Sequence, residues 1–476
     1  MLFNSITFLF YLPIVFGLYW FVCNRNLRLQ NLLVVVVSYV FYGWWDWRFL
    51  GLIAFTSAWS YVVGMLELRR WDDERGNKFL LAVSLIVNLG ILAYFKYFNF
   101  FVGAASDALQ ALGFSPNMPS LNVILPVGIS FYTFQALSYT IDVYRRQIVP
   151  TRDPVAFFAF ISFFPQLVAG PIERATNLLP QFQKPRQFDY AWAVEGCRQM
   201  VWGFVKKVLI ADNCAVVANA ILNDGSSGGV RLWIGMIFFT FQIYGDFSGY
   251  SDIAIGCSKL FGIRLMRNFE HPYFARDIAE FWRRWHISLT TWFRDYLYIP
   301  LGGSRCGTWK KVRNTFAIFL VSGFWHGANW TFVLWGAFHA VCFLPLLLLG
   351  KNRKFTSDVI AQGRWLPTGV EFWGMMSTFF LAVVGWTLFR APDVGTAFTW
   401  FKRMFGELGT PSLGGVGLTN AALPLVVFLV IEWFNRSRDI PALPKGKILR
   451  WCVYCTVVMG LIFLRPQAQA FIYFAF

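Results

Sequence analysis

Repeated apolar stretches of about 20 residues constrain the fold of this chain more than any other feature, because that length lets a helix cross the hydrocarbon layer of a bilayer. They occur at 4–23, 30–46, 49–67, 79–101, 122–143, 154–171, 230–249, 313–330, 331–350, 370–389, 419–435 and 449–465. Several are short or are interrupted by Pro, Gly or charge. We therefore expect an all-α polytopic membrane protein with about ten to twelve transmembrane or re-entrant helices.

Composition supports a membrane protein over a soluble one. Hydrophobic residues make up 57% of the 476 residues and charged residues 14%, whereas soluble domains are roughly a quarter charged. Aromatic residues reach 20%, which fits aromatic belts at two membrane interfaces. Since no repeat of fixed period is visible, we predict a single membrane domain over residues 1–476.

The net charge of +17 is placed as in a membrane protein, so we do not expect a nucleic-acid partner. Alternate loops carry the basic residues, whereas the second and fourth connections carry little charge; the basic loops hold Arg25, Arg28, Arg69, Arg70, Arg75, Lys78, Arg145, Arg146 and Arg152. Because basic loops stay in the cytoplasm, we expect a multi-pass protein of the inner (plasma) membrane. Its N-terminus is expected outside.

Two segments do not read as simple spans. Residues 190–222 mix an apolar face with charged residues, which suits an amphipathic helix at the cytoplasmic interface. Residues 274–300 are too polar to face lipid and too aromatic for a solvated loop. Non-spanning backbone at membrane depth must be buried in protein or line a wet cavity. We therefore expect 274–300 to be a re-entrant or interfacial segment at the functional centre.

Two of the four histidines, His326 and His286, are candidates for proton transfer, because ionisable groups within a bilayer mark functional sites. On a continuous helix His326 would share a face with Ser322, Asn329 and Trp330. By the same spacing His286 would share a face with Arg283, Thr290 and Arg294. The competing interpretation is that each imidazole is a packed, hydrogen-bonded link between helices.

For His339 and His271 we favour that structural interpretation. A metal site is not expected either. The sequence contains no H-x-x-x-H or H-E-x-x-H motif, and Cys does not cluster with His.

A carboxylate cluster lies in the segment QIYGDFSGYSDI. Asp246 and Tyr250 are four residues apart and would meet on a helical face, with Asp252 just beyond. Carboxylates this close to an apolar span must pair, protonate or line a cavity. We expect them to act as electrostatic partners, able to orient an imidazole or an arginine from the His286 segment.

These segments resemble motifs of the membrane-bound O-acyltransferase family. The matching stretches are WRRWHISLTTWFRDYLYIPLGG, SGFWHGANWTFVLWG, IYGDFSGYSDIAIG, LPVGISFYTFQALSYTIDVYR, FPQLVAGPIER and the closing FIYFAF. The chain is similar to the bacterial polysaccharide branch, which includes the alginate O-acetylase membrane subunit and its cellulose-acetylating counterpart. The resemblance spans nearly the whole chain.

The resemblance implies a ring of tilted helices around a central tunnel, with His326 as the catalytic residue and His286 as a second site residue. It implies that acetyl from a cytoplasmic thioester, acetyl-CoA, passes outward through the membrane, with no metal. Periplasmic acetyl-accepting or polysaccharide-acetylating proteins would then place it on an exopolysaccharide.

The chemistry assigns further candidate roles. Acetyl transfer from a thioester to a hydroxyl needs a base and donors for the oxyanion, and Arg294 or Asn329 could supply donors. We place Asp246, Tyr250, Asp252, Arg294, Asp295 and Asn329 as supporting or tunnel residues. A basic cytoplasmic mouth would bind the CoA phosphates, through Arg283, Arg284, Lys310 and Lys311.

Three alternatives stay open. One is D-alanyl transfer towards teichoic acid from a carrier-protein thioester. Another is a non-enzymatic, proton-coupled transporter, although the inverted repeats typical of transporters are not visible. A minor one is a thioester relay at Cys306, where the loop GGSRCG departs from the family pattern.

Overall fold

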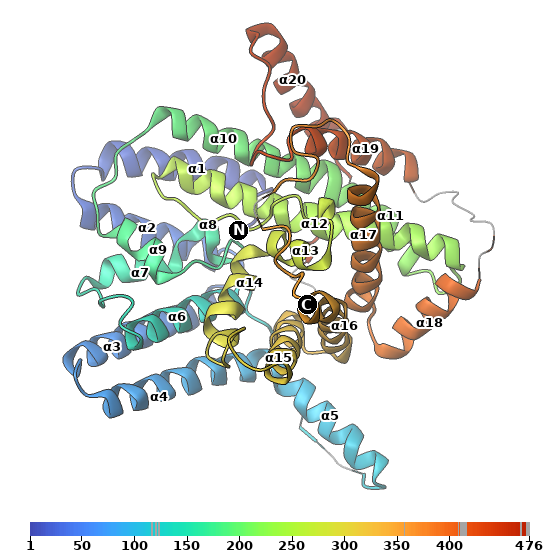
Figure 1. Cartoon of the computed structure of the whole chain (residues 1–476). Coiled ribbons are helices and arrows are strands. Elements are labelled where there is room, and N and C mark those ends of the chain that lie inside the picture. The colour runs from blue at the N-terminus through green and yellow to red at the C-terminus, as the bar shows by residue number, and fades with distance from the viewer. Residues whose placement is uncertain are drawn as a thin grey trace. The chain divides into compact units, whose positions relative to one another are not determined.

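The computed structural model describes residues 1–472, with gaps at 116–117, 120, 122–123, 357, 408, 410–416 and 467–468. Within these residues the chain is helical and contains no strand (Figure 1). This confirms the predicted all-α class. The Gly-rich stretch between Gly406 and Gly417 lies mostly outside the described residues.

The described residues contain four helical segments long and apolar enough to cross a membrane: Trp47–Arg69, Glu74–Ala111, Trp330–Leu348 and Gly369–Arg390. Three shorter apolar segments are Ile6–Val22, Leu27–Gly43 and Leu418–Phe434. All seven overlap expected spans. The full expected number of ten to twelve spans stays a prediction.

The expected span at 154–171 does not form one long helix. It divides into α7 (Pro154–Ser162) and α8 (Phe164–Leu167), and most of its side chains are buried in protein. Pro165 lies in the first turn of α8, where proline is tolerated because that N–H has no helical partner. The chain therefore turns at Phe163 instead of continuing, and the apolar residues of this stretch serve a protein core.

The chain forms two compact units: residues 1–197 with 254–266, and residues 198–253 with 267–476. That the two make one membrane domain stays a prediction. The first unit contains α1 (Ile6–Gly17), η1 (Leu18–Val22), α2 (Leu27–Gly43), η2 (Trp47–Phe49), α3 (Leu50–Arg69), α4 (Glu74–Leu92), η3 (Ala93–Tyr97), α5 (Phe98–Ala111), α6 (Ile129–Tyr144), α7, α8 and α9 (Ala175–Phe182).

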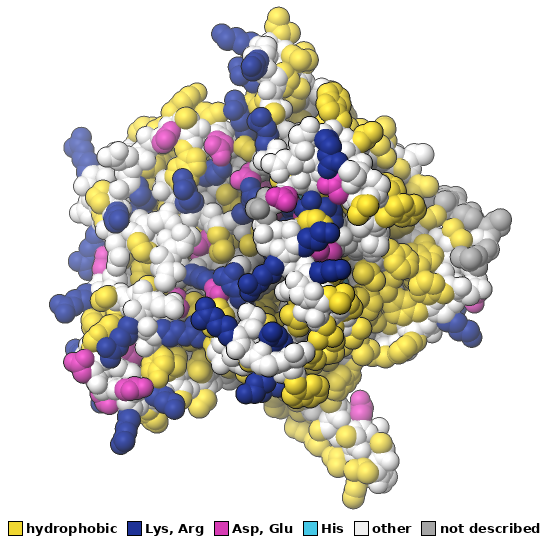
Figure 2. Space-filling view, viewed as in Figure 1, with side chains coloured by type: hydrophobic (Ala, Val, Ile, Leu, Met, Phe, Trp, Pro, Cys, Tyr) yellow, Lys and Arg dark blue, Asp and Glu magenta, His cyan; other side chains and the backbone are white. Residues whose placement is uncertain are grey.

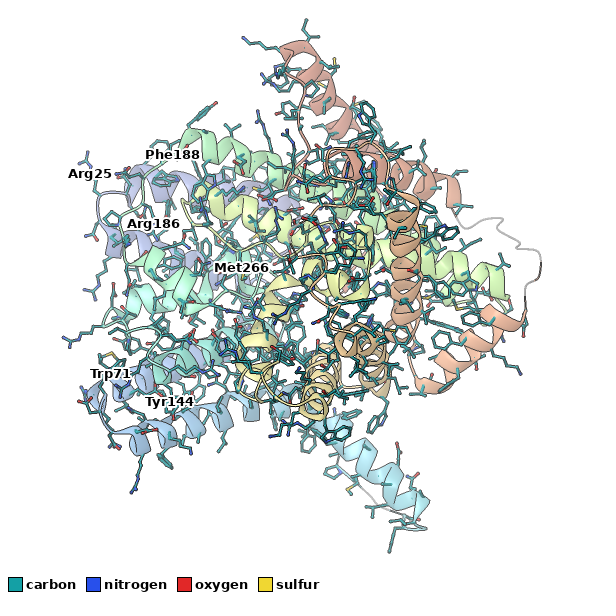
Figure 3. All side chains as sticks on the ribbon, in the orientation of Figure 1. Arg25, Trp71, Tyr144, Arg186, Phe188 and Met266 are labelled. Atoms are coloured by element: carbon teal, nitrogen blue, oxygen red, sulfur yellow. The ribbon has the colours of Figure 1, made fainter. Side chains whose placement is uncertain are left out.

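Buried polar contacts hold the first unit together. The guanidinium of Arg186, labelled in Figure 3, donates to Gln30 Oε1 at 3.0 Å and to Asn31 Oδ1 at 2.6 Å. The Tyr19 hydroxyl and the Trp20 indole donate to backbone carbonyls at the end of α12 (Gly229–Leu260) and just beyond it. These bonds satisfy polar groups that would be costly to bury alone.

The second unit contains α11 (Asp212–Leu222), most of α12, and the helices that follow. These are η5 (Pro272–Phe274), α13 (Ile278–Arg284), α14 (Ile287–Phe293), η6 (Arg294–Tyr298), α15 (Thr308–His326), α16 (Trp330–Leu348), α17 (Gly369–Arg390), α18 (Val394–Gly406), α19 (Leu418–Phe434) and α20 (Lys447–Phe463). Two glycines let α15 and α16 pack closely. A Cβ at Gly323 would clash with the Phe332 carbonyl, and one at Gly336 with the Phe319 carbonyl.

The expected interfacial helix at 190–222 is wrong in its main feature. The segment comprises α10 (Tyr190–Phe204), the π-helix η4 (Val205–Ala211) and α11. Three of its charged residues, Lys206, Lys207 and Asp212, are buried instead of facing water, whereas Glu195 is exposed. Burial is possible because each lysine meets two carboxylates within the second unit, as described below.

Candidate active site

The 274–300 segment is a series of short helices, not one continuous helix. α13 ends at Arg284, α14 begins at Ile287, and His286 lies at the break with a left-handed φ of 44°. That conformation is uncommon for a residue with a side chain and often marks a functional position. The face that we expected His286 to share with Arg283 and Arg294 is therefore absent, because the break turns the chain between them.

His326 is the last residue of α15. The helix stops at Gly327, and α16 starts at Trp330, so the expected common face of His326 with Asn329 and Trp330 does not form. Asn329 instead caps α16, where its Oδ1 accepts from the Thr331 N–H at 3.1 Å and its Nδ2 donates to the Pro392 carbonyl at 2.7 Å. The loop Gly327–Asn329 thus places His326 at a helix C-terminus.

The two breaks bring His286 and His326 together within the second unit. Their ring centroids are 6.4 Å apart, and the residues are 1% and 4% exposed. Aromatic rings enclose the pair. Between ring centroids, Phe247 lies 4.6 Å from His286. The ring centroids of Trp325, Trp335 and Phe389 lie 5.0, 5.2 and 5.3 Å from that of His326. The catalytic roles of the two residues stay predictions.

Asn268 sets the orientation of the His286 ring. His286 Nδ1 lies 3.1 Å from Asn268 Oδ1, and an amide oxygen only accepts, so Nδ1 carries the proton. Asn268 is itself held by Ser251 and Ser288. His286 Nε2 is buried without a hydrogen-bond partner among the described residues. Burial lowers the pKa of His286, so the ring is neutral with a lone pair on Nε2.

No sequence signal singled out Asn268, and the structure supplies its role. We expect Asn268→Ala to slow acyl transfer roughly tenfold, since a lost buried hydrogen bond costs about 1–2 kcal/mol and 1.4 kcal/mol is tenfold in rate. The fall should appear in kcat, with KM for the donor little changed. Ser251→Ala is the matched control, because Ser251 touches Asn268 but not the imidazole. Equal losses in both variants would contradict a positioning role.

Of the other two histidines, His271 makes the hydrogen-bonded link that was expected, whereas His339 makes no hydrogen bond among the described residues. His271 links Glu432 and the Arg438 carbonyl, each at 3.1 Å. His339 is enclosed by aromatic rings, with Trp282 at 4.9 Å and Trp335 at 5.0 Å. Both its nitrogens are buried without a hydrogen-bond partner among the described residues, so it is packed without being hydrogen-bonded.

Asp246 and Tyr250 share a face of α12, as predicted, but the partners of the carboxylates are lysines. Lys207 Nζ bridges Asp246 at 2.7 Å and Asp212 at 2.9 Å. Lys206 Nζ bridges Asp252 at 3.1 Å and Glu432 at 3.3 Å. The expectation that the carboxylates orient an imidazole or arginine from the His286 segment is therefore wrong.

The predicted interfacial helix would have placed Lys206 and Lys207 on its water-facing side. In η4 the wider turn of a π-helix, a form frequent at functional sites, carries both of them inward. Burial raises the pKa of Asp212 to about 6 against the lowering effect of Lys207.

The end of the described chain packs beside this cluster. The Ile472 N–H donates to Asp246 Oδ2 at 2.7 Å, and the Phe471 ring lies 5.1 Å from Tyr250 and 6.4 Å from Phe247. Phe247 also packs on His286. Asp246 therefore anchors the start of the FIYFAF motif near the histidines; residues 473–476 lie outside the described part.

The arginines proposed for donor binding are already occupied. Arg283 donates to the carbonyls of Asn352 at 2.8 Å and Phe355 at 2.9 Å, and Arg284 pairs with Glu280 at 2.9 Å. Arg283 thus attaches residues 352 and 355 to α13, and Arg284 supports α13 itself. Their place in phosphate binding is therefore not favoured.

The remaining candidates lie at the surface. Arg294 pairs with its neighbour Asp295 at 2.6 Å and its side chain is 56% exposed, so it is not beside the two imidazoles. Lys310 is exposed and Lys311 half-buried in the first turn of α15. Both stay available as donor-binding residues.

Metal-ligand groupings of three or more His, Cys, Asp or Glu are absent from the described residues. The thiol of Cys306 donates to the Gly303 carbonyl at 3.3 Å and lies near Asn314. Neither histidine contacts it in the described structure, so the geometry does not favour a thioester relay there.

Comparison with known proteins gives concordant matches. The model of the membrane-bound O-acyltransferase family matches residues 143–385. A protein of Pseudomonas putida named probable alginate O-acetylase is 40% identical, with all of both chains aligned. The peptidoglycan O-acetyltransferase of Helicobacter pylori is 34% identical over 92% of this chain and 84% of its own. The teichoic acid D-alanyltransferase of Bacillus subtilis is 28% identical over 58% of this chain and 71% of its own.

Proposed function

Because the chain belongs to the membrane-bound O-acyltransferase family, we propose that it passes acetyl from a cytoplasmic thioester, acetyl-CoA, across the membrane for O-acetylation of a secreted polysaccharide. One observation carries the proposal. Two buried imidazoles lie 6.4 Å apart, in segments that also hold the family motifs. A neutral imidazole in an aromatic enclosure suits removal of a proton from an acceptor hydroxyl.

His326 is the proposed general base. It takes the hydroxyl proton as the acceptor oxygen attacks the thioester carbonyl and the C–O bond forms. When the C–S bond breaks, His326 returns that proton to the leaving sulfur, so that CoA departs as the thiol and the imidazole is neutral again. The oxyanion needs nearby donors. Arg294 and Asn329 are poorly placed for this, whereas the Trp335 indole beside His326 has a buried N–H without a partner among the described residues. We assign that N–H as the candidate donor.

His286 is proposed to position a hydroxyl group or a water molecule. Its protonated Nδ1 is fixed by Asn268, so the free Nε2 lone pair faces the enclosure as an acceptor. The ring therefore suits holding a hydroxyl group or a water in line with His326. Asp246, Tyr250 and Asp252 support the site indirectly, through Lys207, Lys206 and the C-terminal segment.

The donor identity has a direct test. Purified protein in liposomes, given acetyl-CoA and a hydroxyl acceptor, should release free CoA, and D-alanyl thioester on a carrier protein should not substitute for it. The relatives favour acetyl, since the acetyl-transferring ones match at 34–40% identity and the D-alanyl-transferring one at 28%. Turnover of the D-alanyl thioester alone would establish the alternative. Family membership removes the transporter alternative.

The proposed direction of transfer rests on the expected topology. We propose an inner-membrane protein with its N-terminus outside, a cytoplasmic donor, and periplasmic acetyl-accepting or polysaccharide-acetylating proteins that complete the transfer to an exopolysaccharide. The family's central tunnel, reached by the donor from the cytoplasm and by the acceptor from outside, is part of this proposal.

A reporter fusion tests the orientation. A reporter in residues 68–78 should lie in the cytoplasm and one in residues 104–121 outside, because only the first loop carries clustered Arg and Lys. The measurement is alkaline phosphatase activity, which requires export, compared with a fluorescent protein that matures inside. The reverse pattern would contradict the proposed cytoplasmic position of the donor side.

A further inference from the structure

A cavity of about 320 Å³ lies in the second unit, and none of its lining residues belongs to the histidine site. It is formed by the end of α10, by α19, by the loop that follows α19 and by α20; the lining includes Arg198, Trp202, Ile431, Pro441, Val453 and Val457. Its volume is at the lower end of the roughly 300–1,000 Å³ typical of small-molecule sites.

The walls are apolar, with one cation. Arg198 Nε donates to the Tyr454 hydroxyl at 3.3 Å, while its two terminal nitrogens have no partner among the described residues. Asn435, another polar side chain of the lining, is used to fold the loop: it donates to the Ile431 carbonyl and accepts from the Ala442 N–H. The cavity thus offers an apolar slot with a positive end.

The surroundings fit a lipid. No residue of α20 is buried, and large apolar side chains such as Ile448, Trp451 and Ile462 are more than 60% exposed. Basic residues are concentrated in the adjoining loop and the first turn of α20. Residues 436–450 contain one acidic residue, Asp439, and five basic ones: Arg436, Arg438, Lys445, Lys447 and Arg450. Hydrophobic and basic side chains lie together on α20 at the top of Figure 2.

We propose that this cavity binds one anionic phospholipid, with an acyl chain between the apolar walls and the phosphate on Arg198. Basic pockets beside membrane helices attract anionic headgroups. The uncompensated charge of Arg198 and the basic loop favour phosphatidylglycerol over zwitterionic phosphatidylcholine. The apolar walls make a lipid, and not free glycerol phosphate, the occupant. The proposal does not depend on the acyl-transfer assignment.

Thermal unfolding of delipidated full-length protein in detergent tests this. Phosphatidylglycerol should raise the melting temperature more than phosphatidylcholine does, and glycerol phosphate should have no effect. Arg198→Gln should remove the preference for phosphatidylglycerol. Lys402→Gln, which removes an exposed charge on α18 outside the cavity lining and the basic loop, should keep it. Val453→Trp should fill the slot and reduce the effect of both lipids.

Native mass spectrometry supplies the second measurement. One phosphatidylglycerol should stay bound to the wild type and to Lys402→Gln, and be lost from Arg198→Gln. Equal stabilisation by the two lipids, equal retention in Arg198→Gln, or the same shift from glycerol phosphate alone would each overturn the proposal. Because each variant is compared with and without lipid, a lowered basal melting temperature does not hide the result.

Discussion

Replacing His326 with alanine will reduce acetyl transfer at least about 10²–10⁴-fold, the range that a positioned general base contributes, with membrane insertion retained. The imidazole is 4% exposed and packs against Trp325, Trp335 and Phe389. Since these aromatic rings are not bases, His286 is the one other group of the described enclosure that can take the proton. The measurement is CoA release by purified protein matched for monodispersity.

The control is His339→Leu, which removes a nearby imidazole whose nitrogens make no hydrogen bond in the described structure. It should change the rate less than tenfold. His286→Ala should lower the rate without matching His326→Ala. The double variant should be little worse than His326→Ala alone, because residues that act as a unit are not additive. A normal rate in His326→Ala would refute the assignment.

Replacing Lys207 with methionine will cost about 3–5 kcal/mol of the free energy of unfolding, because it leaves Asp246 and Asp212 as buried charges without their cation. Lys207 Nζ lies 2.7 and 2.9 Å from these carboxylates, and the three side chains are at most 9% exposed. Equilibrium unfolding in mixed micelles, followed by tryptophan fluorescence, gives the change.

Two further variants make that result specific. Lys207→Met combined with Asp246→Asn should recover part of the loss, because one of the two unpaired charges is then gone. Lys259→Met is the matched control: Lys259 pairs with Glu195, whose side chain is 48% exposed, and exposed pairs are worth about 1 kcal/mol or less. Equal losses in Lys207→Met and Lys259→Met would contradict a buried network.

The sequence was informative where a property is local. Apolar length predicted the helical class, and the polar residues in apolar surroundings identified His286, His326, Asp246 and Asp252. The helix breaks at 285–286 and 327–329 were not predicted. Periodicity assumes that a helix continues, and it therefore assigned false faces to Arg294 and Asn329.

Long-range partners could not be predicted either. Asn268 is 18 residues from His286 and carries no motif, and Glu432 reaches Lys206 from a distant helix. The pattern around Lys206 and Lys207 correctly shows a polar and an apolar face. It wrongly predicts that the polar face lies in water, because both lysines are buried. A buried ion pair can be predicted only when both partners are known, and the sequence of one helix contains only one of them.

The most direct test of the central claim is the O-acetyl content of the polysaccharide secreted by the host. Cells lacking the gene should lose the esters, wild-type protein should restore them, and His326→Ala protein inserted at the same level should not. Esters restored by His326→Ala, or unchanged by loss of the gene, would contradict the account.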